Sequence, residues 1–144
     1  MKSIYFILFP FFIFACKPPK VEFLTLTFIA SECFGRCPVF TMTIDVDGTA
    51  FYDAKMHNDK QGKFHTIIKS PQLDSLNMLV GKSDMLNLDN SYSSSWTDEP
   101  TYTLIIKFKN GQIKTISDYG PNGPDKLKKV YNLLFSLRLN QDWR

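Results

Sequence analysis

The sequence predicts an α+β fold, in which an antiparallel β-sheet of about five to six strands carries two helices packed on one face. Three observations predict this fold. Apolar and polar residues alternate along several segments, as they do in half-buried strands. Asp47-Gly48 and Asn110-Gly111 are turn pairs that join such segments into hairpins. Two segments, which follow Ser70-Pro71 and Gly123-Pro124, instead carry apolar residues at helical spacing. The predicted order of elements is β-βββ-α-ββ-α.

The N-terminal segment has the pattern of an export signal. Twelve mostly apolar residues, 4–15, follow the positive charge of Lys2. This run is too short to cross a bilayer core of ~30 Å as a helix. Its end, Ile13-Phe14-Ala15-Cys16, resembles the lipobox of bacterial lipoproteins. The resemblance implies cleavage before Cys16 and lipidation of that cysteine. A plain secretory signal with an incidental cysteine is the alternative.

The rest of the chain is long enough for one domain with a core and too short for two. We expect residues 1–15 to be the signal peptide, residues 16–20 the lipidated Cys16 and its tether, and residues 21–144 a single α+β domain. An Asp directly after the lipidated Cys would resemble an inner-membrane retention signal, and this chain has Lys17 at that position. The expected location is therefore the bacterial cell envelope, at the outer membrane and facing the periplasm.

The charges limit the classes of partner. The chain has 17 Lys and Arg residues against 14 Asp and Glu residues, and the two signs are interspersed. No basic stripe indicates nucleic-acid binding. The expected partners are the membrane, through the N-terminal lipid anchor, and an envelope protein or glycan.

The first strands are predicted from composition and turn chemistry. Residues 21–31 are rich in β-branched and aromatic side chains and indicate a strand buried on both faces. The segment Asp45-Val46-Asp47-Gly48-Thr49 is typical of a three-residue hairpin loop with Gly in the left-handed region. A loop of this length pairs Met42 with Tyr52 and keeps the apolar faces of the two strands together.

The later elements are assigned by the same criteria. A loop at 59–63 joins strands at 50–58 and 64–69, and a helix begins at Ser70-Pro71 with a stripe of Leu73, Leu76 and Val80. A Ser-rich loop at 89–100 precedes a hairpin of strands at 101–109 and 112–119. The final helix has on one side Leu127, Val130, Tyr131, Leu134 and Arg138.

Three motifs occur in order along the domain. They are Cys33-Phe34-Gly35-Arg36-Cys37-Pro38-Val39-Phe40, Asp98-Glu99-Pro100-Thr101-Tyr102-Thr103-Leu104 and Asp118-Tyr119-Gly120. With these motifs, the chain is similar to an uncharacterised family of bacterial domains, often lipoproteins, over residues 24–137. The resemblance implies a single exported domain. It implies no activity and supplies no catalytic residues.

Cys33 and Cys37 are a disulfide candidate, because Cys16 is expected to carry lipid and an exported protein meets an oxidising compartment. A bridge requires Cα atoms roughly 4.4–6.8 Å apart, and Gly35 permits the turn that brings them together.

A metal or redox role for the same cysteines is the alternative. The sequence Cys-x-x-x-Cys-Pro resembles a motif of copper-delivery proteins, which bind Cu(I) through two thiolates and a distant His. The predicted hairpin makes His57 and His65 cross-strand neighbours, so two Cys and two His form a chemically reasonable Zn or Cu(I) ligand set. The two-residue spacing typical of redox-active pairs is absent.

The sequence contains no nucleophile elbow, phosphate-binding loop or His-Glu-x-x-His motif. The carboxylates of Asp98 and Asp118 either anchor loops or serve a hydrolase, and loop anchoring is the preferred interpretation. Trp96 either offers a contact surface in the Ser-rich loop or folds back against the core edge, and folding back is the preferred interpretation. We expect a non-enzymatic binding domain that needs no cofactor. Its candidate contact residues are Tyr92, Trp96, Asp98, Tyr102, Asp118 and Tyr119.

Overall fold

The computed structural model describes residues 23–82 and 84–144. The predicted signal peptide and the whole of the predicted tether, residues 16–20 with Cys16, lie outside these residues. The elements of the described part are β1 (Phe23–Ala30), β2 (Phe40–Asp45), β3 (Thr49–Ala54), β4 (Gly62–Ile67), α1 (Ser70–Lys82), the 3₁₀ turn η1 (Met85–Asn87), β5 (Ser91–Ser93), β6 (Thr101–Phe108), β7 (Ile113–Tyr119) and α2 (Asp125–Asn140).

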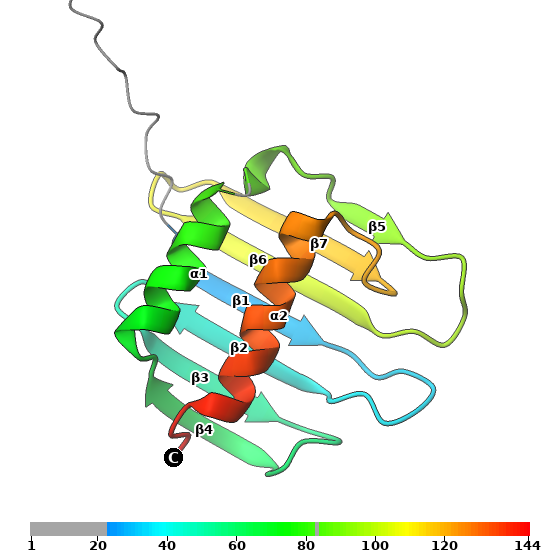
Figure 1. The fold of residues 1–144 in the computed structure, drawn as a ribbon, viewed down its shortest axis with the longest axis horizontal. Coiled ribbons are helices and arrows are strands. Elements are labelled where there is room, and N and C mark those ends of the chain that lie inside the picture. The colour runs from blue at the N-terminus through cyan, green and yellow to red at the C-terminus, as the bar shows by residue number, and fades with distance from the viewer. Residues whose placement is uncertain (1–22, 83) are drawn as a thin grey trace, which may run out of the picture.

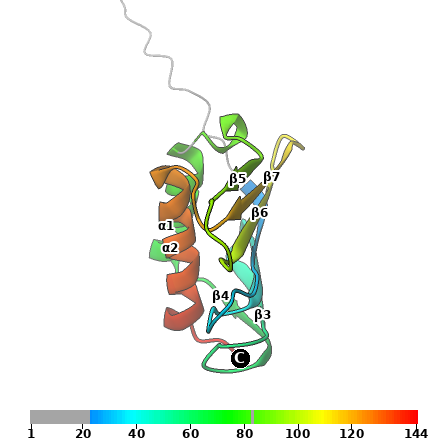
Figure 2. The same ribbon diagram turned by 90° about the vertical axis from the view of Figure 1, so that its right-hand side faces the viewer.

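The strands form one sheet, and both helices pack on the same face of it (Figure 1; Figure 2). The sheet order is β4-β3-β2-β1-β6-β7-β5, so that β1 lies at the centre and β4 and β5 form the edges. All pairs are antiparallel except β5 with β7. The α+β class and the position of the helices confirm the prediction.

The predicted number of strands is wrong. The described residues contain seven strands rather than five to six, because the Ser-rich segment at 89–100 includes β5. The order of elements is therefore β-βββ-α-βββ-α. Buried Lys114 holds this segment against β7, since its Nζ donates hydrogen bonds to the carbonyl oxygens of Leu86 and Leu88 and to Oδ1 of Asn90. A strand of three exposed or half-exposed residues has no sequence periodicity to detect.

The first predicted hairpin is confirmed in its register. Met42 pairs with Tyr52 across β2 and β3. Gly48 has a φ of 89°, its N–H donates to Asp45 O at 2.9 Å, and Thr49 N–H donates to Oδ1 of Asp47 at 2.9 Å. The left-handed glycine thus closes the turn that the sequence predicts.

The second predicted hairpin forms between β3 and β4, but its loop length and register differ from the prediction. Strand β3 ends at Ala54, which pairs with Gly62, so residues 55–61 form a longer loop. The side chain of Asn58 causes this, because its Nδ2 donates to Val39 O at 2.8 Å and to Met56 O at 2.9 Å. These bonds hold the loop beside β2 and prevent β3 from continuing.

The prediction that the first strand is buried on both faces is also wrong for one face. Leu26 and Phe28 of β1 face the helices and are fully buried, whereas Thr25 and Thr27 on the other face are partly exposed. No helix of the described residues covers that second face (Figure 2). The apolar composition of β1 reflects its central place in the sheet.

The core lies between the sheet and the helices. The ring of Phe28 is at its centre, with the rings of Phe40, Tyr102, Tyr131 and Phe135 at centroid distances of 5.5–5.6 Å. Such aromatic pairs add about 0.5–1.5 kcal/mol each beyond the area that they bury. The predicted helix stripes are confirmed: the buried members are Leu76 and Val80 of α1 and Leu127, Val130, Tyr131 and Leu134 of α2. Neither helix in the described residues is long and apolar enough to cross a membrane.

Candidate functional site

The three sequence motifs meet at one end of the sheet, which we call the loop end. It consists of the β1–β2 loop (31–39), the β5–β6 loop (94–100) and the β7–α2 loop (120–124), at the right-hand side of Figure 1. Main-chain hydrogen bonds join the loops: Phe34 N–H donates to Asp98 O at 3.1 Å, and Gly120 N–H donates to Pro100 O at 2.9 Å. Residues far apart in the sequence therefore form one continuous surface.

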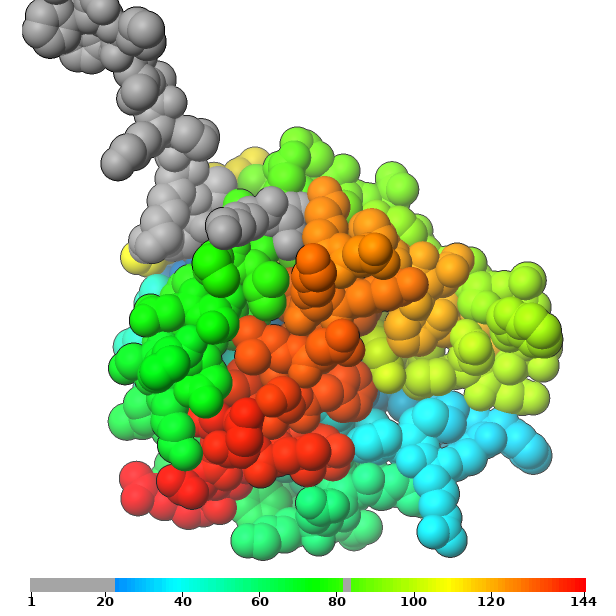
Figure 3. Space-filling view, in the orientation of Figure 1, coloured from blue at the N-terminus to red at the C-terminus, as the bar shows by residue number. Residues whose placement is uncertain are grey.

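The predicted disulfide is present in the β1–β2 loop. Cys33 and Cys37 are bridged, with their Cα atoms 5.7 Å apart. Closing so short a loop stabilises the fold by about 2 kcal/mol in the chain-entropy model. Phe34, inside the bridged loop, has 88% of its side-chain surface exposed, and the loop projects from the molecule (Figure 3). The bridge therefore fixes the backbone beneath an exposed aromatic ring.

Trp96 lies on the neighbouring β5–β6 loop and is 75% exposed. The preferred interpretation, in which Trp96 folds against the core edge, is therefore wrong. The main-chain N–H of Trp96 donates to Oγ of Ser94 at 3.1 Å. Asp98, which is exposed, has a left-handed φ of 66°. These features shape the loop locally and leave the indole in solvent.

Asp118 holds the β7–α2 loop from within. Its side chain has no exposed surface, and Oδ1 accepts hydrogen bonds from Asn122 N–H at 2.7 Å and from Gly123 N–H at 3.2 Å. Two N–H groups just before α2 are thereby satisfied, and that of Gly123 is buried. Asp118 shapes the loop end and has no surface of its own for a ligand.

Three tyrosines surround Asp118. Tyr102 and Tyr92 are its cross-strand neighbours on β6 and β5, and Tyr131 covers it from α2. Burial raises the pKa of Tyr131 far above its ordinary value, and the nearby Asp118 carboxylate raises it further. The phenol is therefore neutral across the physiological range.

Contacts of Tyr119 and Glu99 hold the β5–β6 loop in place. The hydroxyl of Tyr119 accepts a hydrogen bond from Glu99 N–H at 3.3 Å, and Tyr119 O accepts one from Ser94 N–H at 3.0 Å. Gly120 has a φ of 65°, and any side chain there would collide with the Glu99 carboxylate. The loop end is thus a closely packed unit.

The six predicted contact residues lie in one region but differ in exposure. Trp96 and Asp98 are exposed, while the other four are half-buried or buried supports. Sequence reasoning missed Phe34 as a surface residue. The signal was present, because an aromatic residue inside a short disulfide loop has no room to reach the core.

The alternative metal ligands do not come together. Both cysteine sulfurs are in the disulfide. His65 pairs with Phe51 across the sheet, and His57 lies in the 55–61 loop with a φ of 56°. The prediction that the two histidines are cross-strand neighbours is therefore wrong. Among residues 23–82 and 84–144, no group of three or more His, Cys, Asp or Glu side chains is placed to hold a metal ion.

A model of one protein family, a domain of unknown function named DUF6438, matches residues 24–138. The chain belongs to this family. The DUF6438 segment contains the disulfide loop, both other motifs and Asp118, and thus the whole loop end. Residues 139–144 lie beyond the match. A comparison with curated proteins found no match.

Proposed function

We propose that this protein is a lipid-anchored protein of the bacterial envelope whose DUF6438 domain binds another envelope protein through the loop end. The observation that carries the proposal is the pair of aromatic side chains, Phe34 and Trp96, held in solvent on two loops that share a hydrogen bond. Exposed aromatic rings on a rigid support are the usual anchors of protein interfaces.

The chemistry of the loop end favours a protein partner. Arg36 is exposed within the disulfide loop beside Phe34. Trp, Arg and aromatic residues are the types most enriched among those that dominate binding energy. The disulfide fixes the loop of Phe34, and hydrogen bonds to Tyr119 fix the loop of Trp96 before binding, which lowers the entropy that association costs. These features support binding without a chemical step.

The test is capture of the partner from detergent-solubilised envelopes by the tagged full-length protein. We expect Phe34→Ala and Trp96→Ala each to reduce capture roughly tenfold or more, since truncating an interface anchor costs about 1.4–2 kcal/mol or above. Both variants should keep the wild-type unfolding midpoint, because neither ring packs in the core.

Ile113→Ala is the matched control, because Ile113 is 63% exposed at the opposite end of β7. It should leave capture unchanged. If both aromatic variants capture the partner as well as the wild type, the loop end is not the interface. A captured component that survives protease treatment would identify a glycan instead. Free thiols with a stoichiometric metal ion in the intact mass would favour the metal-handling alternative at Cys33, Cys37, His57 and His65.

A further inference from the structure

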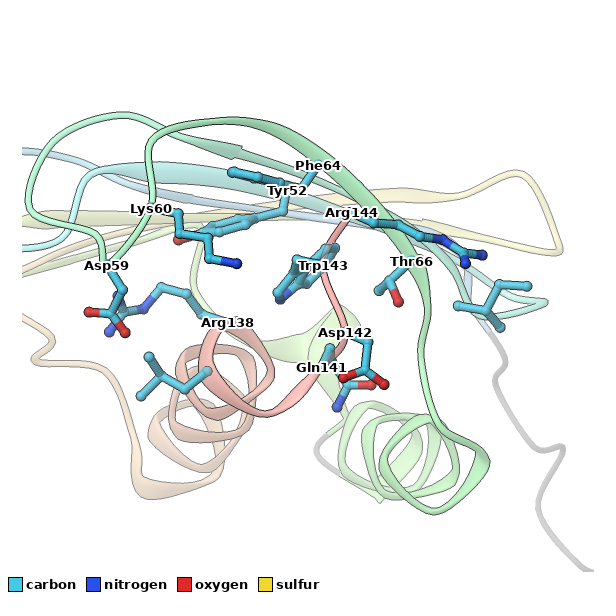
Figure 4. Close-up of a pocket in the computed structure, with 12 residues that line it drawn as sticks. Tyr52, Asp59, Lys60, Phe64, Thr66, Arg138, Gln141, Asp142, Trp143 and Arg144 are labelled. Carbon is cyan, nitrogen blue, oxygen red and sulfur yellow. The ribbon is translucent and has the colours of Figure 1, made fainter.

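A second site, which neither Phe34 nor Trp96 lines, lies on the helix-facing side of the sheet. It is a groove of about 580 Å³ between β4 and the end of α2 (Figure 4). This volume lies within the usual range for small-molecule sites. The segment that follows α2 forms one wall. The lining residues that could contact a ligand include Tyr52, Lys60, Phe64, Arg138 and Trp143.

One wall of the groove is a row of aromatic rings. The ring centroid of Tyr52 is 5.1 Å from that of Trp143 and 6.1 Å from that of Phe64. Tyr52 is buried, whereas Phe64 and Trp143 are partly exposed toward the groove. Such a wall offers a flat apolar contact to a ring-shaped ligand.

The position of Trp143 is fixed by hydrogen bonds. Its Nε1 donates to Leu137 O at 3.1 Å. The next residue, Arg144, exchanges two main-chain hydrogen bonds with His65 of the edge strand β4, at 2.9 and 3.2 Å. The segment after α2 is therefore tied to the helix and to the sheet, and the aromatic wall exists before any ligand binds.

Arg138 and Lys60 supply positive charge opposite this wall. Nη1 of Arg138 donates to the amide oxygen Oδ1 of Asn58 at 3.3 Å, and its Nε is buried without a partner among the described residues. No described carboxylate lies within 4 Å of either cation. Figure 4 shows the Lys60 amine directed toward the space between Arg138 and Trp143. The guanidinium is thus partly desolvated and makes no ion pair within 4 Å among the described residues.

The two acidic residues of the groove limit the charge of a ligand. Asp59 and Asp142 are both exposed, and Asp142 lies 4.0 Å from Lys69. Their charges oppose a doubly charged phosphate more than a singly charged carboxylate. Arg pairs with a carboxylate through parallel hydrogen bonds, and the site favours that anion.

We propose that this groove binds a small molecule that carries a single carboxylate on a flat ring. The ring packs against Trp143 and Phe64, and the carboxylate lies beside Arg138 and Lys60. This site is separate from the proposed interface at the loop end, and it includes residues that lie beyond the DUF6438 match. The two proposals can therefore fail independently.

The test is to titrate the full-length protein in detergent separately with benzoate, benzamide and phenyl phosphate and to measure binding by tryptophan fluorescence. The chain has two tryptophans, so Trp96→Phe leaves Trp143 as the only reporter. We expect benzoate to change the Trp143 emission saturably. Benzamide, which has the same shape without the charge, should bind at least tenfold more weakly, and phenyl phosphate should also bind more weakly than benzoate.

Variants assign the charge effect. Arg138→Gln should weaken benzoate binding to the level of benzamide and leave benzamide unchanged. Arg36→Gln is the matched control, because Arg36 is exposed in the β1–β2 loop and does not line the groove, and it should have no effect. Lys60→Gln, on an exposed loop, should weaken benzoate binding severalfold if Arg138→Gln unfolds the protein. Equal binding of benzoate and benzamide, tighter binding of phenyl phosphate, or no saturable change would each overturn the proposal.

Discussion

At the scale of single residues, the decisive feature is a buried carboxylate that organises a loop. Asp118 is fully buried and accepts hydrogen bonds from the N–H groups of Asn122 and Gly123. The helix that follows has Pro124 at its N-cap without a side-chain cap, so the order of the α2 start depends on Asp118. Gly123 leaves the necessary space, because a Cβ there would lie 2.8 Å from Oδ2 of Asp118.

Replacing Asp118 tests this role. Asp118→Ala leaves the buried N–H of Gly123 and the partly buried N–H of Asn122 without acceptors, so we expect the free energy of unfolding to fall by about 1–3 kcal/mol. The measurement is urea unfolding followed by circular dichroism. Asp74→Asn, an exposed carboxylate on α1, is the control and should change stability by about 0.5 kcal/mol or less. A loss no larger than that of the control would mean that Asp118 does not hold the loop.

At the scale of elements, the fold depends on how loops are fixed to the end of the sheet. The β1–β2 loop is closed by the Cys33–Cys37 bridge and bonded to the main chain at Asp98. Beside this loop, the side chain of Asn58 fixes the 55–61 loop through a hydrogen bond to Val39 O. It also accepts hydrogen bonds from Tyr52 and Arg138, so one amide positions part of the groove.

Removal of the bridge tests its contribution. We expect Cys33→Ser with Cys37→Ser to lower the free energy of unfolding by about 2 kcal/mol, because the unfolded chain regains the entropy of an open loop. Reductant should lower the wild-type stability by a similar amount and leave the double variant unchanged. Insensitivity of the wild type to reductant, with the bridge shown to be reduced by mass, would contradict a stabilising role.

At the scale of the whole molecule, the domain presents two separate candidate surfaces. The loop end has exposed aromatic rings on loops that meet beyond one end of the sheet, and the groove lies between β4 and the end of α2 (Figure 1). A proposed lipid on Cys16 would tether both surfaces to a membrane. Three acyl chains hold a protein far more firmly than the single chain that gives marginal binding.

Substitution of the proposed lipidation site tests the anchor. Wild-type protein should remain in the membrane fraction after a high-salt wash and be released by detergent. Cys16→Ser, which cannot form the thioether, should lose this behaviour, whereas Cys33→Ser with Cys37→Ser should retain it. Equal membrane retention of the wild type and Cys16→Ser would rule out lipidation as the anchor. Density-gradient separation of the two membranes would test the outer-membrane location.

The sequence by itself determined the features that depend on neighbouring residues. The β2–β3 register follows from Asp47-Gly48, the helix stripes from apolar spacing, and the bridge from two cysteines in a short loop, because each is a local consequence of backbone geometry. Only the tertiary structure decided the rest. Strand β5 forms because Lys114 of β7 bonds to the segment that precedes it. The 55–61 loop departs from the predicted hairpin because Asn58 bonds to Val39, directly before β2. Trp143 lines a groove because the next residue, Arg144, pairs with His65. These contacts join residues distant in the chain, and no local pattern records them.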